Sequence, residues 1–260
     1  PYLCVGVAQH CYWAGLRYSL LQAIAGPRNA VARLFDVTAP LRLATNPAHD
    51  QFVVAMNPTF GSRVLERAAQ HEPVMLLQAF EGVAKALAPR VNRKAVMRRS
   101  PDARLAGRLF DVDKIVRPLL GHNTLAFFIN VQKQWEWNSR YWEQRALLAA
   151  ESDLDEGLKY AHHAVALELH PYPLTTLGKL LLRQMERGGN RDGSFSEAFK
   201  RLSSAIETEA QRARVSVHPF LTLISGSARF LDLGGTLTGE QRRVLDGYMG
   251  EARHRFGQDK

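Results

Sequence analysis

The sequence predicts an all-α protein: stacked helical hairpins that form a solenoid, preceded by a section with one small β-hairpin. From residue 137 onward, helical patterns alternate with breaks such as Ser152-Asp153 and His170-Pro171. Strand-like alternation is convincing only between residues 41 and 56. Small residues also recur where neighbouring helices would cross, at Ala146, Ala149, Gly157, Ala161, Ala164 and Gly178.

The first section combines helices with the β-hairpin. Residues 2–25 read as one long, buried helix, and residues 27–38 as a short one. Two strands, 41–44 and 51–56, flank a turn-rich segment, and a further helix follows. Two helices, a hairpin and a helix are close to the content of a winged helix. We therefore expect residues 1–71 to form a winged-helix-like section.

A helical neck is expected over residues 72–136. Glu72-Pro73 opens its first helix, which Pro89 ends, and shorter helical patterns follow. These patterns cover residues 91–97, 102–109, 111–120 and 123–135.

Residues 137–260 carry an internal repeat. His170-Pro171-Tyr172 recurs 48 positions later as His218-Pro219-Phe220, and Gly178 recurs as Gly226 at the same offset. Glu156-Gly157 with Ala164 recurs as Glu197-Ala198 with Ala205, 41 positions later. This spacing of small residues resembles the tetratricopeptide repeat (TPR), whose period is about 34 residues. We expect TPR-like hairpins with insertions between them.

Composition restricts the class of protein. The chain has 260 residues, 46% of them hydrophobic, which is ample for a buried core. No run approaches the roughly 18 to 20 apolar residues of a membrane span, so we expect no membrane association. The cysteine usage favours a cytoplasmic location. Cys4 and Cys11 are seven residues apart, about 10 Å along a helix, too far for a disulfide. They are expected to be reduced core thiols. Because the chain opens inside an apolar segment without Met, we expect it to be a piece of a longer protein.

The sequence lacks the usual signatures of an active site. The adjacent His162 and His163 point about 100° apart on a helix and do not converge on a metal. Asp111-Val112-Asp113 lacks the glycine and glutamate that complete a calcium loop. Neither a phosphate-binding GxxxxGK[ST] motif nor a nucleophilic G-x-S-x-G motif occurs. We therefore assign no catalytic residue, no metal ligand and no cofactor within this chain.

Aromatic and arginine side chains gather at the start of the repeats. On helical spacing Trp137 and Tyr141 share one face, with Trp142 and two arginines close by. One interpretation is packing of the first repeat against the neck. The other is an anchor for a bound protein, because Trp, Tyr and Arg dominate interface hot spots. The candidate partner-binding residues are Trp137, Arg140, Tyr141, Trp142 and Arg145.

Basic residues concentrate in the neck. The net charge of +9 permits an acidic partner without requiring one. The densest part of this basic patch is Arg90, Arg93, Lys94, Arg98 and Arg99. It reads either as a solvated linker or as a docking patch for an acidic surface or a nucleic acid.

Three runs carry a family resemblance. Arg104-Leu105-Ala106-Gly107-Arg108-Leu109-Phe110-Asp111, the run Trp137 to Ala146, and His170-Pro171 with Thr175-Thr176-Leu177-Gly178 are similar to the region after the ATPase module in bacterial STAND-type P-loop NTPases. In that family, a winged-helix and helical segment leads into a TPR-like sensor. The resemblance covers most of residues 1–185.

The resemblance implies the sensor and regulatory portion of a signalling NTPase. Such a protein binds a protein ligand, in several relatives a phage protein, then forms a homo-oligomer and switches on an N-terminal effector. ATP and Mg²⁺ would belong to the NTPase module, which these residues do not contain. Where such winged helices often place a histidine that senses the nucleotide phosphates, this chain has Met56-Asn57-Pro58. Asn57 is therefore the candidate nucleotide-sensing residue. Two alternatives remain: a nucleic-acid-binding winged helix, and a plain TPR scaffold that binds a partner's peptide.

Overall fold

The computed structural model describes residues 1–26, 41–46, 50–91, 100–188, 190–210 and 216–257. These residues form a mostly α-helical protein with one small sheet, as the sequence predicts. Two compact units divide the chain, Pro1–Asn138 (unit 1) and Ser139–Lys260 (unit 2). The boundary expected before Trp137 lies two residues from this division. The separation of the first unit into a winged-helix-like section and a neck stays a prediction.

Unit 1 begins with a correction to the expected helix 2–25. Helix α1 (Tyr2–Cys11) ends early, and strand β1 (Leu16–Arg17) precedes helix α2 (Tyr18–Ala25). Gly15 makes the break possible: its φ is +78°, and a Cβ there would collide with the carbonyl oxygen of Val53. Apolar content alone does not separate a buried helix from a buried turn and strand.

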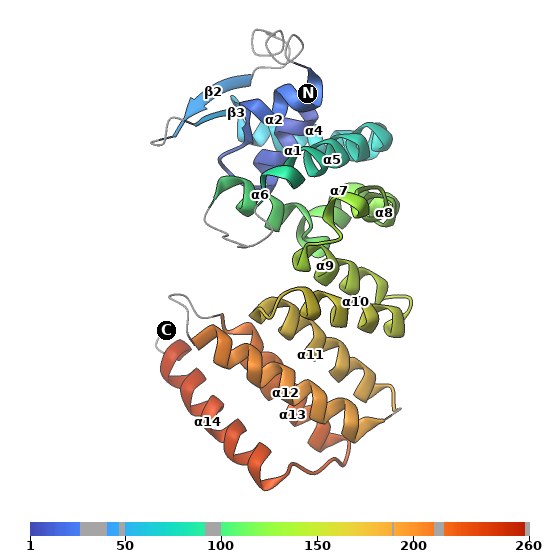
Figure 1. The fold of residues 1–260 in the computed structure, drawn as a ribbon, viewed down its shortest axis with the longest axis vertical. Helices are drawn as coiled ribbons and strands as arrows, with labels where there is room; N and C mark the ends of the chain where they lie inside the picture. The colour runs from blue at the N-terminus through green and yellow to red at the C-terminus, as the bar shows by residue number, and fades with distance from the viewer. Residues whose placement is uncertain (27–40, 47–49, 92–99, 189, 211–215, 258–260) are drawn as a thin grey trace. The chain divides into compact units, whose positions relative to one another are not determined.

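The predicted hairpin is confirmed, and it acquires a third strand. β2 (Leu41–Thr45) and β3 (Gln51–Ala55) pair antiparallel, with Leu41 opposite Ala55 and Thr45 opposite Gln51. β1 joins the other edge of β3, so the sheet order is β1-β3-β2 (Figure 1). A strand between the first two helices that pairs with the hairpin fits a winged-helix-like section. The short helix expected at residues 27–38 lies outside the described residues.

Helices complete unit 1. Asn57 caps α4 (Pro58–His71), and Pro73 starts α5 (Pro73–Leu87), which a 3-10 turn (Ala88–Arg90) extends. Ser100 caps the next helix. The remaining elements are α6 (Pro101–Leu109), a π-helical turn (Val112–Val116), α7 (Arg117–Leu120), a 3-10 turn (Gly121–Asn123) and α8 (Thr124–Trp135). The expected helix at 91–97 falls almost wholly outside the described residues.

Aromatic packing forms much of the core of unit 1. Phe110 lies 4.8 Å from the Trp135 ring, edge to face, and stacks on Phe127 at 5.8 Å. The indole nitrogen of Trp135 donates to the carbonyl oxygen of Ala84 at 3.0 Å, which satisfies a fully buried polar group. Cys4 and Cys11 are buried free thiols on α1, as predicted.

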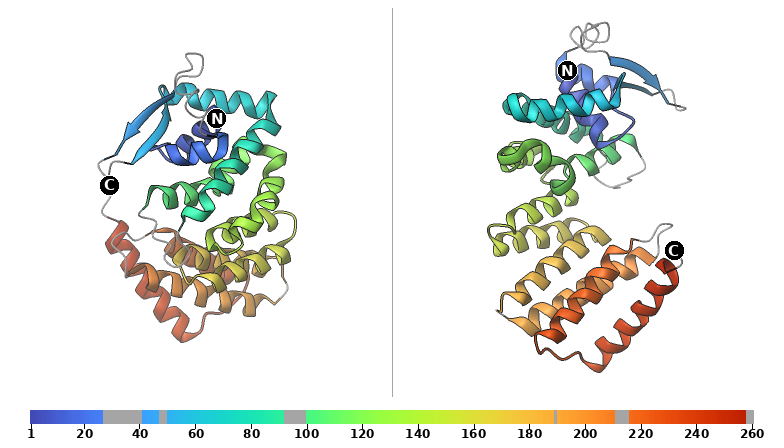
Figure 2. Two further views of the ribbon diagram at one scale, coloured as in Figure 1. Left: turned by 45° about the horizontal axis from the view of Figure 1, so that its top comes forward. Right: turned by 180° about the vertical axis from the view of Figure 1, so that it is seen from behind.

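Six helices make up the described part of unit 2, with breaks at the predicted Ser152-Asp153 and His170-Pro171. They are α9 (Ser139–Ala149), α10 (Leu154–Leu167), α11 (Pro171–Glu186), α12 (Arg191–Ala210), α13 (His218–Asp232) and α14 (Gly239–Phe256). Consecutive helices pack together, and α11 also touches both α9 and α13 (Figures 1 and 2). Contact between the first helices of successive hairpins is the arrangement of a helical-repeat solenoid.

Small residues set the closest approaches in unit 2. Gly157 on α10 lies against Ala150, where an added Cβ would be 2.8 Å from the Ala150 Cα. Gly178 and Gly226, the repeated pair, lie against Leu202 and Leu182 respectively. The final helix begins with a capping box: the side chains of Thr238 and Gln241 each accept from the other's backbone nitrogen, at 3.1 and 2.9 Å.

Candidate protein-binding face

Three of the five predicted partner-binding residues lie inside unit 2. Tyr141 is 0% exposed, Trp142 9% and Arg145 8%. The Trp142 ring packs against Tyr160 at 5.3 Å and His163 at 4.8 Å, both on α10. The Arg145 guanidinium lies over the Tyr160 ring at 5.4 Å. These contacts hold α9 on α10, and a partner could not reach the side chains without displacing α9. The structure therefore favours packing as the role of these three residues.

Trp137 also has a packing role, in unit 1. Its ring stacks on the fully buried Trp135 at 5.6 Å, and its indole nitrogen donates to the carbonyl oxygen of Gln134 at 2.7 Å. The side chain is half-buried. Of the five candidates, Arg140 alone remains near a surface that a ligand of unit 2 could use.

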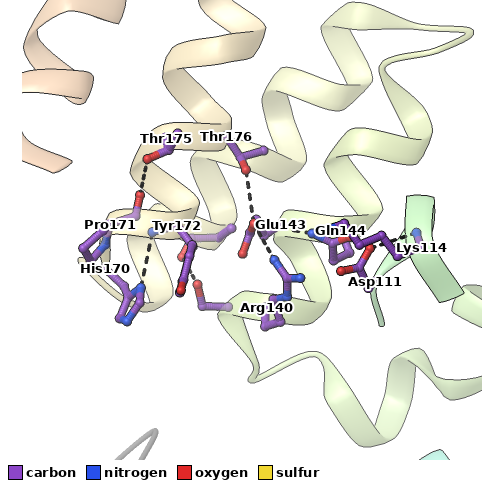
Figure 3. Close-up of polar contacts among 12 residues, drawn as sticks. Asp111, Lys114, Arg140, Glu143, Gln144, His170, Pro171, Tyr172, Thr175 and Thr176 are labelled. Atoms are coloured by element: carbon purple, nitrogen blue, oxygen red, sulfur yellow. Dashed lines mark hydrogen bonds and ion pairs between the residues drawn. The ribbon is translucent and has the colours of Figure 1, made fainter. Parts of the chain in front are cut away.

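Arg140 belongs to a polar cluster around a carboxylate that the sequence analysis did not identify. Its guanidinium donates to Oε1 of Glu143 at 2.7 Å, and the same oxygen accepts from the Thr176 hydroxyl of α11 at 3.2 Å (Figure 3). Glu143 is only 4% exposed, and its second oxygen is buried without a hydrogen-bond partner. This carboxylate links the first helices of two successive hairpins. The i, i+3 spacing from Arg140 was the signal available in the sequence.

The start of α11 is built from His170 and Tyr172. His170 is buried, and its Nδ1 accepts a hydrogen bond from the Tyr172 backbone nitrogen at 3.3 Å, which caps the helix (Figure 3). The two rings stack at 5.0 Å. The cap and the stack together fix the position of Tyr172.

One stripe of α11 is open to solvent. The helix contacts α9, α10, α12 and α13, and most of its side chains are buried. The exposed or half-exposed ones recur every three to four residues along one side. Four of them, Tyr172, Thr175, Lys179 and Arg183, we name the α11 stripe; Gln184 and Glu186 in the last turn are also half-exposed or exposed. Leu169, just before the helix, is 73% exposed.

The stripe changes character along its length. Tyr172 is 39% exposed and presents an aromatic ring at the N-terminal end. The Thr175 hydroxyl donates to the Pro171 carbonyl at 2.6 Å, so it is already engaged. Two cations, Lys179 and Arg183, lie toward the C-terminal end. Within the described chain, the ion pair that α11 makes joins Glu186 to Arg229 and involves neither of these cations.

The two remaining predicted sites are placed only in part. Asn57 is exposed, and its side-chain oxygen accepts from the Phe60 backbone nitrogen at 3.2 Å as the cap of α4. Its nucleotide-sensing role stays a prediction. In the basic patch, Arg90 is exposed at the end of its 3-10 turn, whereas Arg93, Lys94, Arg98 and Arg99 lie outside the described residues.

The described residues offer little support for other kinds of site. Among the described residues, no three His, Cys, Asp or Glu side chains gather as a metal site would require. Within the same ranges, no helix has both the length and the apolarity to cross a bilayer. No protein-family model, curated protein or solved structure matches the chain.

Proposed function

We propose that unit 2 is a protein-binding module whose ligand docks on the face that carries the α11 stripe. The observation behind this proposal is the single open stripe on a helix that is otherwise enclosed by four neighbours. Helical-repeat proteins use extended surfaces of this kind for binding. Tyr and Arg, both present on the stripe, are also enriched in protein interfaces.

The wider role is the sensor portion of a STAND-type signalling NTPase. In this role a protein ligand, such as a phage protein, binds unit 2, and the full-length protein then assembles and switches on its effector. Support comes from the resemblance of residues 104–111, 137–146 and 170–178. A ligand can drive such a switch only if it binds two conformations with different affinity.

A paired capture experiment tests the proposal. The chain and its Tyr172→Ala/Lys179→Glu/Arg183→Glu variant are each immobilised and exposed, with nuclease present, to bacterial lysate prepared with and without phage infection. We expect at least one protein that the wild type retains and the variant loses. A matched variant, Lys159→Glu/Lys200→Glu, changes two exposed lysines on α10 and α12 and should retain that protein. Identical recoveries from all three chains would exclude the α11 stripe as the binding face.

A second candidate function is nucleic-acid binding by unit 1. Unit 1 has 17 Lys and Arg against nine Asp and Glu, a net charge of +8, whereas unit 2 has 17 against 16, a net charge of +1. Nearly all of the excess positive charge therefore resides with the winged-helix-like section and the basic patch. Phosphate backbones attract such a surface independently of sequence.

Gel-shift titration with a 30-base-pair DNA duplex tests this second function. Binding should weaken steeply between 50 and 200 mM salt, because phosphate neutralisation releases counterions. Reversing the charges of Arg93, Lys94, Arg98 and Arg99 should weaken binding at least tenfold. The Lys159→Glu/Lys200→Glu variant in unit 2 should bind like the wild type. No shift at 50 mM salt would exclude the function for this duplex length.

A further inference from the structure

From the chemistry of the α11 stripe, we infer the kind of segment that it recognises: a short acidic segment with one bulky apolar side chain. This inference rests on the proposed function of unit 2. The apolar side chain would contact Tyr172, next to the exposed Leu169. Carboxylates of the same segment would meet Lys179 and Arg183. The sign of the ligand's charge follows from these two cations and from the ion pairs around them.

Neighbouring acidic groups are already engaged elsewhere. Glu143 accepts from Arg140 and Thr176, and Glu186 pairs with Arg229 at 3.5 Å. Lys179 and Arg183 therefore leave a net positive charge on the stripe. Charge complementarity selects partners of the opposite sign and raises their association rate.

Helical geometry sets the spacing of the ligand's groups. Lys179 is seven residues beyond Tyr172, about 10 Å along the axis, and Arg183 is eleven residues beyond, about 16 Å. An extended ligand rises about 3.3 Å per residue and its side chains alternate between two faces, so carboxylates on the same face as the apolar residue would follow it by roughly four and six positions. The inference thus specifies a pattern as well as a net charge.

Fluorescence anisotropy with three labelled peptides provides the test. Each peptide has 14 residues with a single Phe, and the positions four and six residues after Phe carry Glu, Gln or Lys. We expect the Glu peptide to bind at least tenfold more tightly than the Gln peptide, and the Lys peptide to bind most weakly. No measurable binding of the Glu peptide to the wild type, or tighter binding of the Lys peptide, would overturn the inference.

Variants distinguish binding at the α11 stripe from non-specific attraction to a positively charged chain. Lys179→Glu/Arg183→Glu should weaken binding of the Glu peptide at least tenfold, and Tyr172→Ala should weaken binding of all three peptides by the same factor. Lys159→Glu/Lys200→Glu removes the same charge elsewhere in unit 2 and should change binding less than twofold. Equal losses in the two charge variants would mean attraction to net charge alone and would contradict the inference. Circular dichroism of each variant confirms that it is folded.

The two proposals can fail separately. If the capture experiment finds a stripe-dependent protein but the Glu peptide shows no preference, the binding face is correct and its stated chemistry is wrong. If neither experiment depends on the stripe, both proposals are wrong.

Discussion

At the scale of single residues, burial decides the roles of the conspicuous side chains. Tyr141, Trp142 and Arg145 have the composition of an interface hot spot, yet they lie within unit 2. Composition cannot separate an anchor for a partner from an anchor for the neighbouring helix, because both need a large side chain with a polar end. Glu143 shows the reverse case. Glutamate is ordinarily a surface residue, but this side chain is buried between two hairpins.

The buried thiols follow the same logic. Burial raises the pKa of Cys4 and of Cys11, which lowers the fraction of reactive thiolate at neutral pH. Both side chains act as small apolar groups in the core of unit 1. The expectation of free core thiols was correct because a spacing of seven residues on one helix excludes a disulfide, and α1 does contain both residues.

Ionisation of Tyr141 is expected to lower the stability of the fold at alkaline pH. Burial raises the pKa of its hydroxyl to about 12, although the Arg145 guanidinium, which hydrogen-bonds the hydroxyl, acts in the opposite direction. A group whose pKa is higher in the folded than in the unfolded state stabilises fully below the unfolded pKa, here about 10. That contribution is lost as the pH rises from about 10 toward 12. Tyr141→Phe should remove this part of the pH dependence, as measured by urea unfolding at pH 8, 10 and 11.

The test compares how steeply the unfolding free energy of each chain falls with pH. The wild type should lose more unfolding free energy between pH 10 and 11 than Tyr141→Phe does. The other tyrosines with raised pKa values, Tyr2, Tyr160 and Tyr248, are present in both chains and cancel in the difference. Parallel slopes would show that Tyr141 ionises as freely in the folded as in the unfolded chain.

At the scale of elements, caps and breaks made unit 2 predictable. Asp153 caps α10, with hydrogen bonds of 2.9 and 3.0 Å to the first turn, and Pro171 and Pro219 stand at helix starts. These signals are local in the chain, so they can be read without knowing the fold. The break at Gly15 is different, because the reason for it is the carbonyl of Val53, 38 residues away.

Two glycine-to-alanine changes should have opposite effects on stability. Gly157→Ala places a methyl group 2.8 Å from the Cα and 2.9 Å from the nitrogen of Ala150, so backbone must move. We expect a loss of about 2 kcal/mol, in the range for overpacked positions. Gly247→Ala on α14 meets no atom within 4 Å. It should stabilise by about 0.5 to 1 kcal/mol, because alanine favours a helix over glycine.

Thermal and urea unfolding of the two variants would measure both effects. The substitution is chemically identical, so the difference between the variants isolates the helix crossing from helix propensity. A stabilising Gly157→Ala would mean that α9 and α10 are packed less closely than the structure shows.

At the scale of the whole molecule, each unit has its own core. The hydrophobic core of unit 2 joins residues from α9 through α14 and contains Leu177, Leu202 and Phe220 among its fully buried members. Stacked repeats of this kind are stabilised by contacts between neighbouring hairpins. Positive charge is unevenly divided between the units, with a net charge of +8 in unit 1 and +1 in unit 2.

A fragment of residues 139–260 should therefore fold by itself. We expect a helical circular dichroism spectrum and a cooperative thermal transition, because a core of this extent lies within the fragment. The thiols of Cys4 and Cys11 report on unit 1 alone, since unit 2 has no cysteine. Their reaction with a thiol reagent during urea unfolding of the whole chain gives the matching curve for unit 1. A non-cooperative fragment would show that unit 2 depends on unit 1.

The sequence by itself determined the helical class, the β-hairpin, the six helices of unit 2 and the small residues at their crossings. Periodicity, caps and repeat offsets are properties of neighbouring residues, so the chain states them directly. Only the tertiary structure decided that α1 stops before β1, that Tyr141 and Trp142 are interior, and that Glu143 joins two hairpins. It alone also reveals the α11 stripe. Which face of a helix remains open depends on the helices packed around it, and those come from distant parts of the chain.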